Sequence, residues 1–393
     1  MIIGIDIRVL GYSVKSGIEE YAENLIPLLI KEGGDIQFKL FYSSSKNKLP
    51  NYSWLKEKNV ELHTFNYSNN LLFTSARFLN RPFIDKMVGG ADVFFFPHFF
   101  LSSLSPSCKR VTTFHDLSYV HFPERLTLRK KIWHSVQMNP KWQAKFSDKL
   151  IAVSESTKND LVNFYKVDPA RVEVIHSGAL LRLNLNMRFN LNKFKREKNL
   201  PDRFILFLGK LEPRKNTVGV IRAFNNLKSN PKYNDVGLVI AGAKGWKCDD
   251  LFREANVGTS DVCWTSDVVN SCDVGNIIFT GQINDEERSL YYRAADVFVY
   301  PSFFEGFGFP PLEAMVSGIP VITSRNSSLP EVVGDAAIMI DPYDISELEL
   351  WVTKLLDKDL ANLMVKKGIE QSSKFNWRST ATKTLETLIR AKT

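Results

Sequence analysis

Two carboxylates, Glu305 and Glu313, stand eight residues apart on either side of a glycine-bearing turn, GFGFPPL. Backbone N–H groups of such a turn, together with the start of a helix, make a binding site for an anion. A carboxylate beside an anion site needs hydrogen-bond donors, and sugar hydroxyls supply many of them. The turn lacks the Gly-Lys-Ser/Thr of P-loop nucleotide hydrolases. The alternative is a solvated loop glutamate and a glutamate stabilised by a helix dipole.

The segments around this turn predict a strand, loop, helix and strand in succession. ADVFVYPS before it and IPVITS after it are apolar runs typical of buried strands. Pro310 and Pro311 can begin a helix, and Gly318 can end it in a left-handed conformation. This unit implies a parallel sheet, so the turn is expected at the carboxyl edge, where open α/β sheets bind ligands.

Two further loops that follow apolar strands carry polar side chains. Arg214 and Lys215 follow the strand FILFLG, and two adjacent cations can neutralise a diphosphate before and during its departure. His115 and Asp116 follow a strand that begins at Arg110. A single histidine after a strand is more often structural than functional.

The motif Glu305-GFGFPPL-Glu313 resembles the Glu-x7-Glu signature of family-four retaining glycosyltransferases of the GT-B fold. Ala314, Gly318, Pro320 and Val321 fall in the same register. In that family the first glutamate contacts the donor sugar and the second contacts the ribose of the nucleotide. The turn between them offers backbone N–H groups to the diphosphate and the sugar.

The resemblance extends to other segments. FHDLSYVHFPE is similar to a segment of bacterial mannosyl- and rhamnosyltransferases, which implies that His115 lies against the donor hexose and that Asp116 contacts the acceptor or orients the loop. EPRKN is similar to the family's phosphate-binding segment. Because Lys210 stands where many relatives have arginine, either Lys210 or Arg214 is expected to reach the phosphates.

The resemblance therefore implies two sets of residues. The catalytic set is His115, Arg214, Lys215 and Glu305. The substrate-binding set is Gly17, Asp116, Lys210, Gly281, Ile283, Gly306, Phe307, Gly308, Phe309, Leu312 and Glu313. Within the second set, Gly17 is expected near the donor phosphates and the acceptor, and backbone groups near Gly281 and Ile283 are expected to read the base.

The length of 393 residues predicts two domains. By resemblance the fold class is α/β, GT-B, with two Rossmann-like parallel-sheet domains facing across a cleft. The expected domains are an acceptor-side domain at 1–178, a nucleotide-sugar domain at 179–372, and a helix at 373–393 that crosses back to the first domain. The segment at 247–275 has no functional interpretation.

Apolar periodicity predicts the positions of individual elements. In the first domain the expected strands are 2–9, 37–43, 60–65, 91–100, 110–120 and 171–179, with a strand running into a helix at 150–165 and a helix at 76–89. Residues 180–202 lose periodicity and are expected to form a connector. The region 345–393 is expected to be helical.

The net charge of +8 and the pI near 9.1 favour an anionic partner. Residues 125–149 hold seven lysines or arginines against one acid, Asp148, with aromatic residues interleaved. One interpretation is a solvated helical face whose aromatic side chains turn to the core. The other is a surface for anionic lipid head groups or a lipid-diphosphate acceptor. No nucleic-acid module accompanies the charge, so no nucleic-acid partner is expected.

Four cysteines without C-x-x-C spacing, and no signal peptide, favour reduced thiols and a cytoplasmic location, with peripheral contact at the inner face of the membrane. The chain lacks an Asp-x-Asp metal signature in a plausible loop, so we expect no metal and no cofactor beyond the sugar-nucleotide co-substrate.

The predicted function is retaining, metal-independent transfer of a hexose to a growing glycan. The resemblance favours mannose from GDP-mannose, and a surface polysaccharide such as an O-antigen on a polyprenyl-diphosphate lipid as acceptor. Three alternatives stay open: a UDP- or dTDP-sugar donor, a GT-B sugar-nucleotide epimerase, and a non-catalytic sugar-binding assembly protein.

Overall fold

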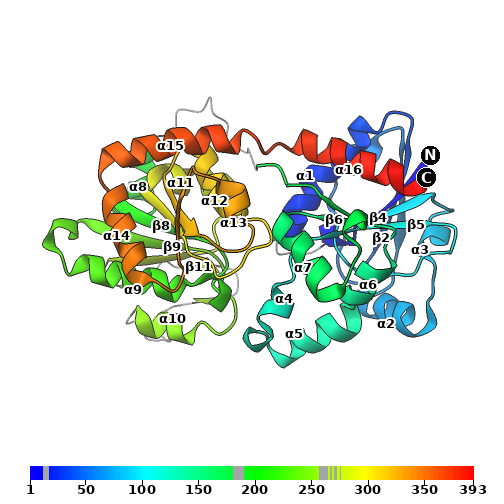
Figure 1. Cartoon of the computed structure of the whole chain (residues 1–393), viewed down its shortest axis with the longest axis horizontal. Helices are drawn as coiled ribbons and strands as arrows, with labels where there is room; N and C mark the ends of the chain where they lie inside the picture. Colours follow the sequence, from blue (N-terminus) through cyan, green and yellow to red (C-terminus); the bar gives the residue numbers. More distant parts are fainter. Residues whose placement is uncertain (12–16, 180–189, 256–263, 266–267, 270–271, 275) are drawn as a thin grey trace. The chain divides into compact units, whose positions relative to one another are not determined.

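A computed structural model describes residues 1–11, 17–179, 190–255, 264–265, 268–269, 272–274 and 276–393. The chain divides into two compact units, and each is described by itself. Unit 1 comprises residues 1–178 and 375–393, and unit 2 comprises residues 179–374 (Figure 1). The C-terminal segment from residue 375 onward therefore packs with the first unit.

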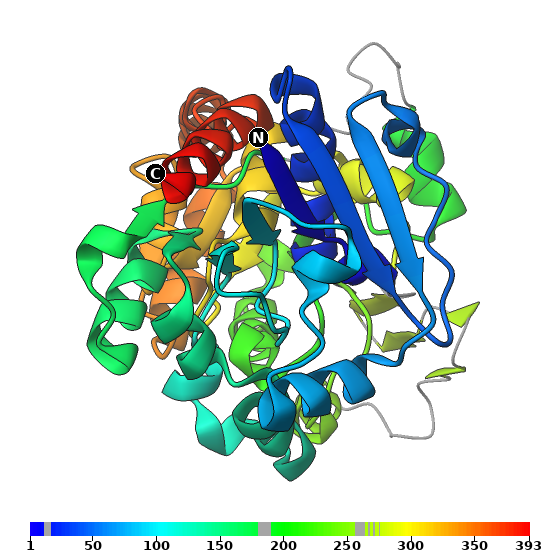
Figure 2. The ribbon, with the colours of Figure 1, turned by 90° about the vertical axis from the view of Figure 1, so that its right-hand side faces the viewer.

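Unit 1 is built on a seven-stranded sheet in the order β3-β2-β1-β4-β5-β6-β7, with every neighbouring pair parallel. Its strands are β1 Ile2–Asp6, β2 Gln37–Ser43, β3 Val60–Phe65, β4 Val93–Phe96, β5 Lys109–Phe114, β6 Lys149–Ala152 and β7 Val172–Val174. Its helices are α1 Gly17–Glu32, α2 Asn69–Leu79, α3 Ile84–Met87, α4 Ser118–His121, α5 Leu128–Ile132, α6 Pro140–Phe146, α7 Glu155–Tyr165 and α16 Trp377–Lys392. Figure 2 shows α16, in red, beside the N-terminus.

Unit 2 is built on a second seven-stranded sheet, in the order β12-β13-β9-β8-β14-β15-β16. Its strands are β8 Arg203–Leu208, β9 Val236–Ala241, β12 Cys272–Val274, β13 Ile277–Gly281, β14 Val297–Tyr300, β15 Val321–Ser324 and β16 Ile338–Ile340. Its helices are α8 Leu191–Glu197, α9 Thr217–Lys228, α10 Asp249–Glu254, α11 Asp285–Ala294, α12 Phe309–Val316, α13 Leu329–Val333, α14 Ile345–Leu355 and α15 Lys358–Ser372. Strand β12 pairs antiparallel to β13, and all other pairs in this sheet are parallel.

The predicted α/β class with two Rossmann-like domains is confirmed, because each unit has a sheet that is parallel apart from the β12–β13 pair and has the strand order of a doubly wound domain at its centre. The unit around the glycine-bearing turn is also confirmed. Helix α12 has prolines in its first turn, and Gly318 after it has a φ of 75°. Within residues 247–275, the described part contains α10, β12 and a short antiparallel hairpin of β10 Trp264–Thr265 and β11 Val268–Val269.

Several predicted bounds are wrong for physical reasons. Strand β1 ends at Asp6 rather than at residue 9, because Arg8 turns back and its Nη2 donates to Asp6 Oδ2 at 2.6 Å. Strand β4 stops before Pro97, and β5 stops before His115. The helix expected at 76–89 is two helices, α2 and α3, separated by a segment that contains Pro82.

The expected connector at 180–202 contains a helix, α8, that periodicity did not reveal. Asn190 caps it by accepting from the N–H of Lys193, and Phe194 is its buried residue. One apolar anchor in seven residues leaves no periodic signal. Residues 180–189 of the same segment lie outside the described residues.

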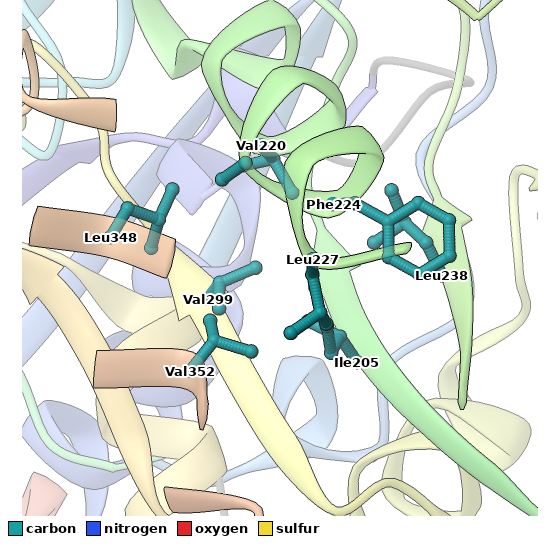
Figure 3. Close-up of a pocket in the computed structure, with 9 residues that line it drawn as sticks. Ile205, Val220, Phe224, Leu227, Leu238, Val299, Leu348 and Val352 are labelled. Atoms are coloured by element: carbon teal, nitrogen blue, oxygen red, sulfur yellow. The ribbon is translucent and has the colours of Figure 1, made fainter. Parts of the chain in front are cut away.

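A small apolar pocket of about 10 Å³ lies in the core of unit 2, between α9, α14 and the sheet (Figure 3). Its lining is apolar throughout: Ile205, Val220, Ala223, Phe224, Leu227, Leu238, Val299, Leu348 and Val352. A ligand site needs polar groups to orient its ligand. This pocket is therefore a packing gap and lies apart from the polar residues described next.

Candidate functional site

The polar site of unit 2 lies at the carboxyl edge of two neighbouring strands, β8 and β14, which pair in parallel. Arg214 and Lys215 end a short 3₁₀ helix, Pro213–Lys215, that follows β8. Glu305 lies in the loop between β14 and α12. Carboxyl ends of parallel strands meet at one edge of the sheet, which explains why residues about 90 positions apart in the sequence come together.

Glu305 forms ion pairs with both cations. Its Oε2 lies 2.9 Å from Arg214 Nη1, and its Oε1 lies 2.7 Å from Lys215 Nζ. Lys215 Nζ also donates to the hydroxyl of Tyr300, the last residue of β14. Arg214 Nη1 donates to the carbonyl of Phe304 at 2.5 Å. The three residues predicted to act in catalysis from this unit therefore form one cluster.

Serine hydroxyls fix the loop that carries Glu305. Ser302 Oγ donates to Glu305 Oε1 at 2.6 Å, and the N–H of Glu305 donates to Ser327 Oγ at 2.8 Å. Ser328 Oγ lies 2.9 Å from the carbonyl oxygen of Glu305 and 2.8 Å from that of Phe307. Both ends of the backbone at Glu305 are thus tied to the segment that joins β15 to α13.

Electrostatics keep Glu305 ionised. Burial by itself would raise the pKa of this carboxyl, but Arg214 and then Lys215 lower the pKa to about 2. Burial and the neighbouring Arg214 lower the pKa of Lys215, while Glu305 raises it. The site therefore contains a buried carboxylate whose charge is balanced by cations.

Glu212 also belongs to the cluster, although it was not among the predicted site residues. Glu212 is buried. Its Oε1 accepts hydrogen bonds from Arg214 Nη2 at 2.8 Å and from Arg214 Nε at 3.2 Å. Arg214 thus lies between two carboxylates, those of Glu212 and Glu305. A glutamate two positions before an arginine is too common a pattern to signal this arrangement by itself.

Glu313 is buried in α12 and faces α11. The hydroxyl of Tyr292 donates to Glu313 Oε2 at 3.0 Å, and Arg288 Nη1 lies 3.5 Å from Oε1. Burial and the nearby Glu313 raise the pKa of Tyr292 well above its ordinary value, so this phenol stays a donor. Arg288 was not predicted, because it lies in a helix whose surface carries many charges.

The turn between the two glutamates has a glycine that no other residue replaces easily. Gly308 has a φ of 113°, and a Cβ added there would lie 2.9 Å from Leu329 Cδ2. Gly306 and Phe307 are buried, and Phe309 packs edge-on against Phe307 with ring centroids 5.2 Å apart. Leu312 is fully buried, so its side chain belongs to the core of unit 2.

The other predicted residues of unit 2 lie on the same sheet edge but outside the ion-pair cluster. Lys210 is exposed, with its Nζ 5.8 Å from the centre of the Trp246 ring. Gly281 ends β13, and its carbonyl accepts from the N–H of Gly242 at 2.7 Å. Ile283 is half-buried just before α11. Of Lys210 and Arg214, it is Arg214 that lies beside Glu305.

Unit 1 presents a second group of polar residues at the carboxyl edge of β4 and β5. His115 follows β5, and its Nε2 lies 2.7 Å from the carbonyl oxygen of Pro97, which makes Nε2 the protonated nitrogen. Burial lowers the pKa of His115 to about 4, whereas the bond to Pro97 raises it. His115 is therefore neutral at pH 7. Asp116 accepts from the N–H and the hydroxyl of Ser118, so it orients the loop before α4.

His98 stands beside His115, although it was not among the predicted site residues. The two ring centroids are 5.9 Å apart. His98 Nδ1 is buried without a hydrogen-bond partner among the described residues. Its position directly after the buried strand β4 is the signal that could have identified it. Gly17, the remaining predicted residue, is exposed as the first residue of α1.

No group of three or more His, Cys, Asp or Glu side chains among the described residues is placed to hold a metal ion. Across the described helices, none is long and apolar enough to cross a membrane.

Family models match both halves of the chain. The model described as Glycosyltransferase Family 4 matches residues 15–180, and the model described as Glycosyl transferases group 1 matches residues 189–371. The chain is 28% identical to the O-antigen chain mannosyltransferase B of Escherichia coli, over 94% of this chain and 95% of that relative. It is 29% identical to the serotype-specific mannosyltransferase WbdA of Escherichia coli over 70% of this chain, which spans 32% of that relative's length.

Solved structures with the same fold cover nearly the whole chain. Sucrose-phosphate synthase from Thermosynechococcus elongatus matches with a TM-score of 0.70 at 19% identity, covering 99% of this chain and 98% of that one. WaaG, a glycosyltransferase involved in lipopolysaccharide biosynthesis, matches with a TM-score of 0.68 at 17% identity, covering 98% and 99%. With two family models side by side along its length, the chain belongs to the family-four glycosyltransferases of the GT-B fold.

Proposed function

We propose that this glycosyltransferase moves mannose from GDP-mannose to a growing surface polysaccharide. The relatives named as O-antigen and serotype-specific mannosyltransferases support mannose and this class of acceptor. The observation that carries the proposal is the convergence of Arg214 and Lys215 on the carboxylate of Glu305. Such a cluster can exchange one anion, the carboxylate, for another, the donor diphosphate.

The exchange gives Glu305 and the two cations distinct tasks. When the donor enters, its diphosphate takes the positive charges of Arg214 and Lys215. The carboxylate of Glu305 is then left to accept hydrogen bonds from the hydroxyls of the sugar. Cations that neutralise the departing diphosphate lower the barrier to cleavage. Because protein side chains supply this charge, we propose that the reaction needs no metal ion.

We further propose that the anomeric configuration is retained by front-face displacement. The bond from the anomeric carbon to the diphosphate oxygen breaks, and a bond to the acceptor oxygen forms on the same face. The acceptor's proton passes to an oxygen of the departing diphosphate, so the products are the glycoside and GDP. No covalent enzyme intermediate is needed, and Glu305 binds sugar hydroxyls rather than attacking carbon.

The acceptor is proposed to be a glycan on a polyprenyl-diphosphate lipid, with the enzyme in the cytoplasm at the inner face of the membrane. The expectation rests on the relatives of O-antigen synthesis and on the basic stretch at 125–149. An acceptor at the inner face of the membrane would meet nucleotide-sugar donors in the cytoplasm, where these donors are made.

The proposal is tested by incubating the full chain with a lipid-linked glycan acceptor and single sugar nucleotides in the presence of EDTA. We expect a product one hexose heavier with GDP-mannose, and NMR of the new linkage should give the same anomeric configuration as the donor. Turnover only with UDP- or dTDP-sugars would show that the donor is one of these and not GDP-mannose. A changed sugar nucleotide in the absence of acceptor would indicate an epimerase, and binding without product would indicate a non-catalytic protein.

A further inference from the structure

Two neighbouring helices of unit 1, α2 and α5, expose large apolar side chains. Helix α2 presents Leu71, Phe78 and Leu79, and the last two are 72% and 71% exposed. Helix α5 presents Leu128, which is 73% exposed, and Ile132. Single exposed apolar side chains are common on protein surfaces, but a cluster of them on neighbouring helices marks an interaction site.

The exposed residues form one stripe on each helix. Leu71, Phe78 and Leu79 are spaced by seven and eight positions, and Leu128 and Ile132 by four, so each set lies on one helical face. Helix α2 packs against Trp133–Met138, the π-helical segment that continues α5. Figures 1 and 2 both place α2 and α5 at the same end of unit 1.

The stripe on α2 is not a poorly packed core face, because the opposite face of the same helix is the one that packs into the core. Leu72 and Phe73 are buried, and the ring of Phe73 lies 5.8 Å from that of Phe100. Ser68 caps the helix by accepting from the N–H of Leu71. The helix is therefore anchored on one side and presents the other to solvent.

The sequence around the two stripes carries basic residues but no acidic ones. Residues 66–84 and 126–146 contain no Asp or Glu. Among the side chains of α2, α5 and their neighbours that the structure describes, the exposed cations are Arg77, Arg81, Arg129 and Lys131. A surface with apolar side chains surrounded by cations is complementary to a bilayer that has anionic head groups over an apolar interior.

We propose that the α2–α5 surface docks on an anionic lipid bilayer, with Phe78, Leu79 and Leu128 entering the head-group region. The basic residues around them lie against the anionic head groups. The contact deepens the proposed role at a membrane-linked acceptor, but lipid binding itself does not depend on the donor or on catalysis. A nucleic acid would explain the cations but not the apolar stripes.

The test is sedimentation of the full chain with vesicles of phosphatidylglycerol and phosphatidylcholine, compared with vesicles of phosphatidylcholine alone. One variant combines Phe78→Ser with Leu128→Ser, and a second combines Arg129→Glu with Lys131→Glu. The control combines Leu363→Ser with Ile369→Ser, two apolar positions on α15 that are each 52% exposed. Melting temperatures of all variants report on folding, and all substituted side chains are exposed.

We expect the wild type and the control to bind the anionic vesicles and not the neutral ones. Each cation near an anionic surface strengthens binding by about fivefold, so the charge variant should lose at least tenfold in partition coefficient, and the apolar variant a similar factor. Folded patch variants that bind like the control would overturn the proposal. So would equal binding to neutral vesicles, or self-association of the wild type that the apolar variant abolishes without any lipid binding.

This result is separable from the proposed function. Transfer to a water-soluble acceptor analogue should be unchanged in both patch variants, because none of the substituted residues belongs to the catalytic or the substrate-binding set. Loss of vesicle binding with normal transfer supports the docking surface. If the wild type bound vesicles normally but showed no transfer, the docking surface would stand and the proposed transferase function would be wrong.

Discussion

Glu305 forms ion pairs with the same cations that we assign to the donor diphosphate. Arg214 and Lys215 contribute two positive charges, and Glu212 and Glu305 contribute two negative ones. A diphosphate must compete with carboxylates for these cations. The arrangement favours a donor whose sugar can satisfy the displaced Glu305, because otherwise a buried carboxylate would lose its partners.

Replacement of Glu305 by glutamine should therefore change binding and turnover in opposite directions. The Glu305→Gln variant should bind GDP at least fivefold more tightly, because the competing charge is gone. Its turnover should fall at least about 100-fold, since a preorganised contact that strengthens in the transition state is typically worth this much. Calorimetric titration with GDP and initial rates with donor and acceptor measure the two effects.

A matched control is Glu370→Gln, an exposed glutamate on α15. It should match the wild type in both measurements. Weaker GDP binding by Glu305→Gln, with the fold intact, would show that the carboxylate supports the diphosphate rather than competing with it.

The pKa of His115 gives the second prediction at the level of single residues. A histidine whose folded pKa is about 4, against an ordinary value of 6.5, stays neutral in the folded chain while the unfolded chain takes up a proton. Its contribution to stability is therefore complete above pH 6.5 and is lost as the pH falls toward 4. Relative to His115→Gln, the wild type should lose up to about 3 kcal/mol over this interval.

Urea unfolding at several pH values between 4 and 7.5 measures this difference in unfolding free energy. His115→Gln removes the titrating group, so it is the reference that accounts for the titration of all other groups in the wild type. A constant difference between the two proteins across the interval would contradict a buried, neutral His115.

At the scale of the element, the turn before α12 depends on Gly308. An alanine there would be strained by the positive φ and would contact Leu329 at 2.9 Å. We expect Gly308→Ala to cost about 1–3 kcal/mol of stability and to weaken GDP binding at least fivefold, because the turn must shift. Thermal unfolding and titration with GDP measure the two changes.

Gly318→Ala is the matched control at the other end of α12. It also has a positive φ, but its added Cβ would have its nearest neighbour, Val365 Cγ1, at 3.9 Å. It should lose stability through backbone strain while GDP binding stays within twofold of the wild type. If both variants lost GDP binding equally, the effect would belong to the stability of the helix and not to the shape of the turn.

The sequence predicted those elements whose pattern is local. Prolines at the start of α12 and Gly318 after it are read directly from the chain, and apolar runs gave the central strands of both sheets. The bounds that failed depend on contacts formed only after folding. Strand β1 ends early because Arg8 reaches back to Asp6, and no periodicity encodes that contact.

The candidate site was likewise predicted where a motif marks it. The proximity of Arg214, Lys215 and Glu305 follows from parallel strands that end at one edge. Glu212 and His98 were missed because their significance lies in spatial neighbours, Arg214 and His115. Distances between loops that follow different strands depend on the order of strands in the sheet, which motifs alone do not give.

At the scale of the whole molecule, the predicted roles divide between the two units. The cations and both glutamates of the turn belong to unit 2, and His115 belongs to unit 1. Because the cations and the two glutamates proposed to bind the nucleotide lie in unit 2, His115→Ala should leave GDP affinity within twofold of the wild type. Its turnover should fall at least tenfold if His115 contacts the transferred hexose, as initial-rate measurements would show. A large loss of GDP affinity would contradict this division.

The most direct test of the central claim is calorimetric titration of GDP, in EDTA, into the wild type and into Lys215→Met. Lys366→Met, an exposed lysine on α15, serves as the control. If Lys215 exchanges Glu305 for the donor diphosphate, the wild type and the control bind GDP without metal, and folded Lys215→Met binds at least tenfold more weakly. Equal affinity of all three proteins, or binding that needs a divalent metal, would contradict the account.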